Sequence, residues 1–186
     1  MTARRLTLLT MFACTVLVAA PVWIRPDIRF IWNASASVPV GLYRIVPVRR
    51  IEVTDLAVVM PPAELATFLD ERGYQPRGLP LIKRVLALSG TIDCRSGAEI
   101  VAYGTTYGRA RDRDTLGRAL PTWQGCRTLR HGEAFFMNWG SPESFDSRYF
   151  GPLPLSTVIG QAVPVWTTDD PDPATESLRE PVSDEP

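Results

Sequence analysis

The sequence is poor in histidine and cysteine and has no excess charge of either sign. Its 186 residues include one histidine and three cysteines, and 20 basic residues balance 20 acidic ones. Balanced charge provides no global field for a nucleic-acid backbone, so direct nucleic-acid binding is not expected. His131 lies in a turn-like segment with no serine or cysteine placed to pair with it, which argues against a His-dependent triad. A closed zinc site would need more thiol and imidazole ligands.

Long helical stretches are also missing after the first 24 residues. The chain contains 17 prolines and 13 glycines, which interrupt helices and favour short strands and turns. One helix is predicted over Pro61–Tyr74, where proline opens the segment and Gly73 ends it. Segments rich in β-branched and aromatic residues are Ile45–Val59, Leu81–Leu88, Ile92–Cys94, Glu99–Tyr103, Ala134–Met137 and Thr157–Val165. These patterns predict one mainly β domain over residues 25–168.

The one long apolar run lies at the N-terminus. Leu6 to Ile24 carries no charge over 19 residues and would reach about 28 Å as a helix, close to the thickness of a bilayer core. Arg4 and Arg5 precede it and are expected to stay in the cytoplasm, which places the following domain outside. Residues 1–24 are therefore interpreted as a membrane anchor. A cleaved signal peptide is the alternative, although Val18-Ala19-Ala20 lacks the usual A-x-A site.

The C-terminal segment has a different composition from the body. Residues 169–186 contain seven acids against one arginine and no aromatic residue. Such a segment buries too little apolar surface to offset its ordering entropy, so a disordered acidic tail is expected.

Cys94 and Cys126 are the two cysteines outside the apolar run, which itself holds Cys14. In an exported domain an even pair of this kind is expected to form a structural disulfide. The Arg-rich segment Tyr103–Gln124 is interpreted as a mobile, solvated loop, and deletion of Gly108 to Gly117 is expected to leave the fold intact.

Two segments carry residues that suit nucleophilic catalysis. Small residues lead up to Ser37, and Pro39 and Gly41 then fix a turn that could present its hydroxyl and backbone N–H on a tight bend. Lys83 lies inside the apolar run Pro80–Leu88, where desolvation would lower its pKa and free an amine to act as a base. Each signal also has a structural interpretation: an ordinary turn for Ser37 and a snorkelling side chain for Lys83.

Taken in order, the motifs resemble a known family. The anchor is followed by Ser37-Val-Pro39, by Lys83-Arg-Val with a later glycine, and by Ser144-Phe-Asp-Ser-Arg-Tyr-Phe-Gly151. This series is similar to the signal peptidase I (S26) family, and Gly41-Leu-Tyr43 is most like its branch of TraF-type conjugal-transfer peptidases. The resemblance implies a fold of two antiparallel β-sheets, an active site near the membrane and no cofactor.

The resemblance also assigns roles to single residues. It implies Ser37 as the nucleophile and Lys83 as the general base. Ser35 would complete the oxyanion hole and Ser144 would orient the lysine. Asp146 matches one half of an internal ion pair with Arg148, and in the TraF branch an acid here is associated with catalysis, so both a structural and a catalytic role stay open.

The implied activity is that of a serine endopeptidase anchored in the inner membrane, with its catalytic domain in the periplasm. Its expected substrate is a pilin precursor or another exported protein, which it would trim and could cyclise. Two alternatives remain: a general leader-cleaving signal peptidase, and a catalytically silent scaffold subunit of a secretion machine. Asn138-Trp-Gly-Ser141 and Val38 depart from the usual bacterial signal peptidase pattern, which argues against the first of these.

Overall fold

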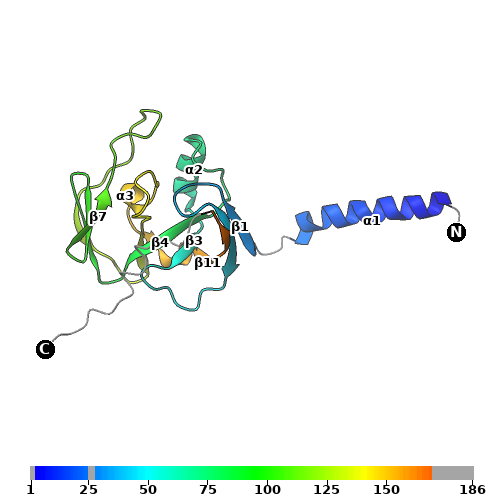
Figure 1. Ribbon diagram of the computed structural model, residues 1–186, viewed down its shortest axis with the longest axis horizontal. Helices are drawn as coiled ribbons and strands as arrows, with labels where there is room; N and C mark the ends of the chain where they lie inside the picture. The colour runs from blue at the N-terminus through cyan, green and yellow to red at the C-terminus, as the bar shows by residue number, and fades with distance from the viewer. Residues whose placement is uncertain (1–2, 25–27, 169–186) are drawn as a thin grey trace.

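A computed structural model describes residues 3–24 and 28–168 of the chain (Figure 1). The N-terminal helix α1 (Ala3–Ile24) extends away from a β-rich body (Figure 1). It is long and apolar enough to cross a membrane, and side chains such as Leu9, Phe12 and Leu17 are exposed along it. A signal sequence would have the same properties. In either case, burial of these side chains in lipid or against other apolar surfaces would be favourable. The predicted acidic tail, residues 169–186, lies outside the described residues.

The body contains two antiparallel sheets, as the resemblance to the S26 family implies. A seven-stranded sheet has the order β1-β2-β11-β3-β4-β9-β10, and a four-stranded sheet has the order β7-β6-β5-β8. The strands are β1 (Phe30–Asn33), β2 (Gly41–Val46), β3 (Leu56–Val59), β4 (Leu81–Leu88), β5 (Ile92–Ser96), β6 (Glu99–Ala102), β7 (Thr105–Arg109), β8 (Gly125–Thr128), β9 (Glu133–Phe136), β10 (Leu153–Pro154) and β11 (Val158–Thr167). The helices after α1 in the described residues are α2 (Ala63–Glu71), α3 (Ser147–Phe150) and the 3₁₀ turn η1 (Leu155–Thr157).

Strand β4 is an interior strand of the larger sheet. It pairs with β3 on one side and β9 on the other, and Leu81 to Ala87 are all buried. Val85 packs into a cluster with Val59 and Phe136, whereas Leu86 packs into a second cluster with Ile100 and Phe135. Because successive strand residues face opposite sides, the largely apolar run that predicted this strand covers both faces of the sheet. Lys83 therefore lies in a strand that is paired on both edges and buried on both faces.

Helix α2 occupies the middle of the predicted Pro61–Tyr74 segment. Pro62 precedes its first turn, and Gly73 follows it with a φ of 67°, a left-handed conformation that glycine adopts without steric cost. The predicted strand Ile45–Val59 is wrong as one unit: the chain leaves β2 after Val46 and enters β3 only at Leu56.

The predicted disulfide is present. Cys94 on β5 lies directly opposite Cys126 on β8, and their sulfur atoms are bonded. Strand β8 is exposed along its length, so this covalent bond and the pairing with β5 are what hold it to the sheet.

The prediction of a mobile, solvated loop at Tyr103–Gln124 is corrected by the structure. Part of it forms β7, and Ala110 and Leu120 are buried against Tyr149. Asp114 accepts hydrogen bonds from the Tyr74 hydroxyl at 2.6 Å and from Arg118 Nε at 2.7 Å. The charged composition of the segment suggested solvent exposure and gave no sign of these hydrogen bonds. Deletion of Gly108 to Gly117 would remove buried and hydrogen-bonded residues, so the fold is not expected to tolerate it.

Asp93 on β5 supplies a pH-dependent term in stability. Its carboxylate is fully buried, has no hydrogen-bond partner among the described residues, and has its pKa raised to about 7 by burial, against a smaller opposing effect of Arg127. The folded chain thus keeps a proton that the unfolded chain releases near its ordinary pKa of 3.8. Stability should accordingly fall as pH rises from about 4 to about 7 and level off above.

We expect Asp93→Asn to remove this component. Urea unfolding of the wild type at pH 5.5 and pH 8 should show lower stability at the higher pH, and the variant should show a smaller difference. Asp70→Asn, at an exposed carboxylate paired with Arg77, is the matched control and should keep the wild-type difference. An Asp93→Asn chain with the wild-type pH dependence would contradict the prediction.

Candidate active site

The turn between β1 and β2 presents Ser37. A single side chain organises it: Asn33 Nδ2 donates to the backbone carbonyls of Ser35 at 2.7 Å, Val38 at 2.9 Å and Pro39 at 3.2 Å. These bonds fold the chain back on itself, as asparagine side chains commonly do in turns. The hydroxyl of Ser35 lies 2.8 Å from that of Ser37. The nucleophile predicted from the sequence is thus half-buried on a tight bend beside a second hydroxyl.

The end of this turn is fixed by close packing. Tyr43, fully buried in β2, donates its hydroxyl proton to the Pro39 carbonyl at 2.7 Å. Gly41 lies so close to β11 that an added Cβ would sit 2.1 Å from the Trp166 carbonyl oxygen. The Ser-x-Pro-x-Gly-Leu-Tyr pattern is therefore explained by local geometry: a serine on a bend, a glycine at a close approach and a tyrosine bonded back to the bend.

Lys83 is the third residue of β4 and is only 4% exposed. Its Nζ donates a hydrogen bond to Ser144 Oγ at 2.8 Å. Burial lowers the pKa of Lys83 to about 8, with the negative charge of Asp146 opposing the shift and the positive charge of Arg148 adding to it. A substantial fraction of the amine is then neutral in mildly alkaline solution, the form that can accept a proton from a hydroxyl. Lys83 is also the only lysine in the sequence.

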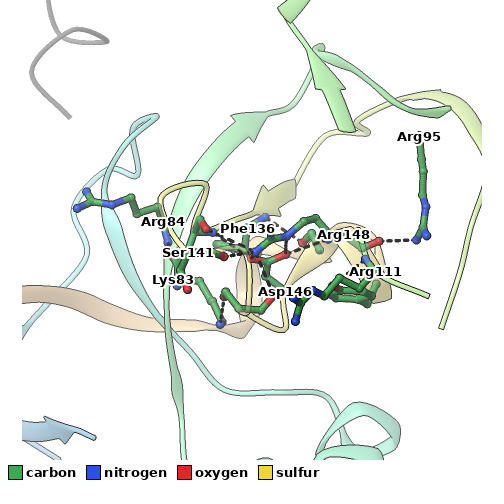
Figure 2. A network of polar contacts seen from close by, with 12 residues as sticks. Lys83, Arg84, Arg95, Arg111, Phe136, Ser141, Asp146 and Arg148 are labelled. Carbon is green, nitrogen blue, oxygen red and sulfur yellow. Dashed lines mark hydrogen bonds and ion pairs between the residues drawn. The ribbon is translucent and has the colours of Figure 1, made fainter. Parts of the chain in front are cut away.

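A buried ion pair supports Ser144. Asp146 caps the N-terminus of α3 and accepts two bonds from the Arg148 guanidinium, at 2.8 Å from Nε and 2.8 Å from Nη2. Arg148 Nη2 also donates to the carbonyls of Ser141 at 2.7 Å and Ser144 at 3.0 Å (Figure 2). Asp146 forms no ion pair or hydrogen bond with Lys83 in the described structure. Its direct contacts hold the Ser144 loop, which favours a supporting role over contact with substrate.

The sequence did not indicate the supporting role of Asn138, which is buried just beyond β9. Its Oδ1 accepts from the Arg84 backbone N–H at 2.8 Å and its Nδ2 donates to the Ile82 carbonyl at 3.3 Å. The residues on both sides of Lys83 are therefore held by one side chain. The only signal available was a polar residue directly after the apolar segment Ala134–Met137.

One cavity brings the predicted groups together. It has a volume of about 850 Å³ and is lined by Ser35, Ser37, Lys83 and Ser144 together with a largely apolar wall. Ser37 and Lys83 form no direct hydrogen bond in the described structure. Catalytic hydrogen bonds are often long before substrate binds, so this does not conflict with a shared role. Among the described residues no group of three or more histidine, cysteine or acidic side chains could hold a metal ion.

The sequence profile described as "Signal peptidase, peptidase S26" matches residues 2–167. The chain belongs to this S26 family. It is 36% identical over 148 residues to the conjugal transfer protein TraF of Agrobacterium fabrum, covering 74% of this chain and 82% of that protein. It is 34% identical over 148 residues to a plasmid transfer protein TraF of Escherichia coli, covering 73% and 81%. An Enterococcus faecalis signal peptidase I structure aligns over 61% of this chain and 97% of that chain, with 18% identity and a TM-score of 0.37.

The single lysine of this S26 family member allows its pKa to be measured directly. Lysine labelled with ¹³C at Cε should give one resonance, which we expect to titrate with a midpoint near pH 8 because Lys83 is buried. Unfolding in urea should return the midpoint toward the ordinary value of 10.5. A folded-state midpoint above pH 10 would contradict the assignment of a desolvated lysine.

Proposed function

We propose that this S26 family member is a serine endopeptidase with a Ser37–Lys83 dyad. The observation that supports it best is that one cavity is lined by both Ser37 and Lys83. Ser37 presents its hydroxyl on a bend, and Lys83, the only lysine in the sequence, is buried and donates a hydrogen bond to Ser144. An ordinary turn would not need a lysine nearby, and a snorkelling lysine would not be 4% exposed.

The chemistry proceeds through an acyl-enzyme. Neutral Lys83 accepts the hydroxyl proton of Ser37 as Ser37 Oγ bonds to the scissile carbonyl carbon. The resulting oxyanion is stabilised by the Ser37 N–H and by the Ser35 hydroxyl. Protonated Lys83 then gives its proton to the leaving amine as the peptide bond breaks. Ser144 accepts a hydrogen bond from Lys83 throughout and keeps its amine directed toward Ser37.

The acyl-enzyme can be resolved in two ways. Attack by water, with Lys83 again taking a proton, releases a linear carboxylate. Attack by the substrate's own N-terminal amine, whose proton Lys83 takes, forms a new peptide bond and releases a cyclic product. In both cases the ester bond to Ser37 breaks and Lys83 passes the proton to Ser37 Oγ. The names of the TraF relatives support an exported substrate of a conjugal transfer system, and we propose a pilin precursor.

Membrane attachment would bring such a substrate to the site. Trp32 on β1 and Trp166 on β11 are both more than half exposed and stack with ring centroids 5.8 Å apart. Phe30 lies beside them on β1 and is also exposed. Phe30 and Trp32 follow α1 closely in the sequence, and Trp166 stacks on Trp32. Exposed aromatic side chains favour the membrane interface. We propose that residues 1–24 anchor the chain in the inner membrane and that residues 25–168 form the periplasmic peptidase domain.

Mass spectrometry of a co-expressed pilin precursor tests the proposed function. The wild-type enzyme should yield a trimmed product, and a cyclic product is one water lighter than the trimmed linear form. Ser37→Ala should leave the precursor intact. Cleavage of an unrelated exported preprotein instead of the pilin would point to a general signal peptidase. An unprocessed pilin in a functioning transfer system would point to a scaffold.

Loss of the Ser35 hydroxyl is expected to slow cleavage without preventing it. Ser35→Ala removes one of two oxyanion donors, which should lower kcat by roughly 10²–10³. Cleavage rates of the precursor or of a peptide from its cleavage site measure the effect. Ser96→Ala, on the exposed part of β5, should leave the rate unchanged. A Ser35→Ala enzyme with the wild-type rate would exclude this hydroxyl from the oxyanion hole.

A further inference from the structure

Arg95 on β5 is a buried cation with no acidic partner at contact distance. It is 2% exposed and forms no ion pair among the described residues. Burial lowers the pKa of its guanidinium, with weaker opposing effects from Tyr149 and Asp112. Removing a guanidinium from water without a carboxylate to pair with it costs stability. Its presence therefore has to be explained by what it contacts.

Its contacts lead from the smaller sheet to α3. Arg95 Nη1 donates to the backbone carbonyl of Arg148 at 2.7 Å, and Nε donates to the Gly97 carbonyl at 3.1 Å. Helix α3 has only four residues, and the last carbonyls of a helix need partners from outside it. In the view of Figure 2, Arg95 and Lys83 lie on opposite sides of Asp146 and Arg148.

Arg95 contacts Arg148, and Arg148 in turn positions Ser144, the hydrogen-bond partner of Lys83. The Arg148 side chain donates to the Ser144 carbonyl at 3.0 Å, and Ser144 Oγ accepts the Lys83 bond at 2.8 Å. A shift of the Arg148 backbone would therefore move the Ser144 loop and the amine that it directs. The neighbouring carbonyl of Ser147 accepts a bond from Trp123 Nε1 at 3.2 Å, a second contact that keeps α3 in register.

We propose that Arg95 is a positioning residue for catalysis: it fixes α3 from the smaller sheet so that Ser144 keeps Lys83 directed at Ser37. This inference rests on the proposed Ser–Lys function. It assigns the four-stranded sheet a part in the reaction, although no residue of that sheet lines the cavity.

Arg95→Met in the full-length chain tests the inference, because methionine fills similar space without charge or donor. We expect kcat for a cleavage-site peptide to fall by about 10- to 100-fold, as misplacement of a catalytic group by about 1 Å can do, with KM changed less than about twofold. The thermal midpoint should change little, because the variant loses two hydrogen bonds to backbone carbonyls but no longer buries an unpaired charge. Arg95→Lys, which can still donate to the Arg148 carbonyl, should recover part of the rate. Arg109→Met, at an exposed arginine paired with Glu99 on the same sheet, is the matched control and should match the wild type.

The ¹³Cε resonance of Lys83 separates failure of this inference from failure of the proposed function. Its titration midpoint should change in Arg95→Met and stay unchanged in Arg109→Met. An inactive wild-type chain would reject the dyad, whereas this resonance would still report on Arg95. A wild-type kcat in Arg95→Met, or an unchanged Lys83 resonance, would overturn the positioning role. So would a lowered thermal midpoint in both Arg95 variants with equal loss of activity, since that is the behaviour of a structural residue.

Discussion

Replacing Lys83 with methionine is expected to abolish peptide cleavage while leaving the chain folded. The general base disappears, and general base catalysis alone contributes roughly 10²–10⁴ in rate, more when the nucleophile depends on it. The fold should persist because methionine fills similar space in a strand that is apolar on both sides and no longer carries a buried amine. Lys83→Arg should be inactive as well, since a guanidinium with a pKa above about 12 cannot act as a base.

Steady-state cleavage of a cleavage-site peptide, together with circular dichroism, measures both effects. His131→Ala is the control: this exposed residue lies in the turn before β9, as its sequence context predicts, and its loss should leave the rate unchanged. The wild-type rate should rise with pH through about 8 as Lys83 loses its proton. An active Lys83→Arg enzyme would exclude Lys83 as the base.

Replacing Asp146 with asparagine is expected to cause the largest loss of stability. Asp146 and Arg148 are at most 1% exposed, and the carboxylate also caps α3. Asparagine leaves the Arg148 cation buried without a counter-charge, and breaking a buried pair in this way costs about 3–5 kcal/mol. Activity should fall too, because the Ser144 loop depends on Arg148. Urea unfolding measures the stability change.

Two further variants make this result specific. Glu99→Gln breaks an exposed ion pair with Arg109 and should cost no more than about 1 kcal/mol. The double variant Asp146→Asn with Arg148→Met removes both charges and should be more stable than Asp146→Asn alone. If Asp146→Asn unfolds at the wild-type urea concentration but is inactive, Asp146 has a direct catalytic role instead of a supporting one.

Strands whose residues show a clear apolar pattern could be predicted from the sequence. The run Leu81–Leu88, apolar except for Lys83 and Arg84, corresponds residue for residue to β4, because a strand buried on both faces is apolar at most of its positions. The turn at Ser37 was also recognisable, since glycine, proline and small residues have strong local preferences. Strand β8 was not, because Gly125–Thr128 is polar and exposed and is held by pairing and by the Cys94–Cys126 bond. Tertiary contacts, not local propensity, make it a strand.

The residues that line the candidate site could be predicted from the sequence, whereas the residues that hold them in place could not. Local sequence pointed to Ser37 and Lys83, and a family resemblance assigned their roles and added Ser144. All three residues line one cavity in the structure. Asn138 and Arg95 were missed because their partners are backbone carbonyls and amides far along the chain, which leave no pattern in a single sequence. The segment around Asp114 was misinterpreted for the same reason: its charge suggested solvent exposure, whereas Tyr74 and Arg118 bond to that carboxylate.

The most direct test of the account is to trap the acyl-enzyme. The full-length chain in detergent would be mixed with an ester of a cleavage-site peptide, quenched in acid within seconds and digested for peptide mapping by mass spectrometry. We predict a mass increase equal to the acyl part of the substrate on the peptide that contains Ser37, present in the wild type and absent in Ser37→Ala and Lys83→Met. Cleavage of the substrate with no adduct, or an adduct on any other residue, would contradict a Ser37–Lys83 dyad.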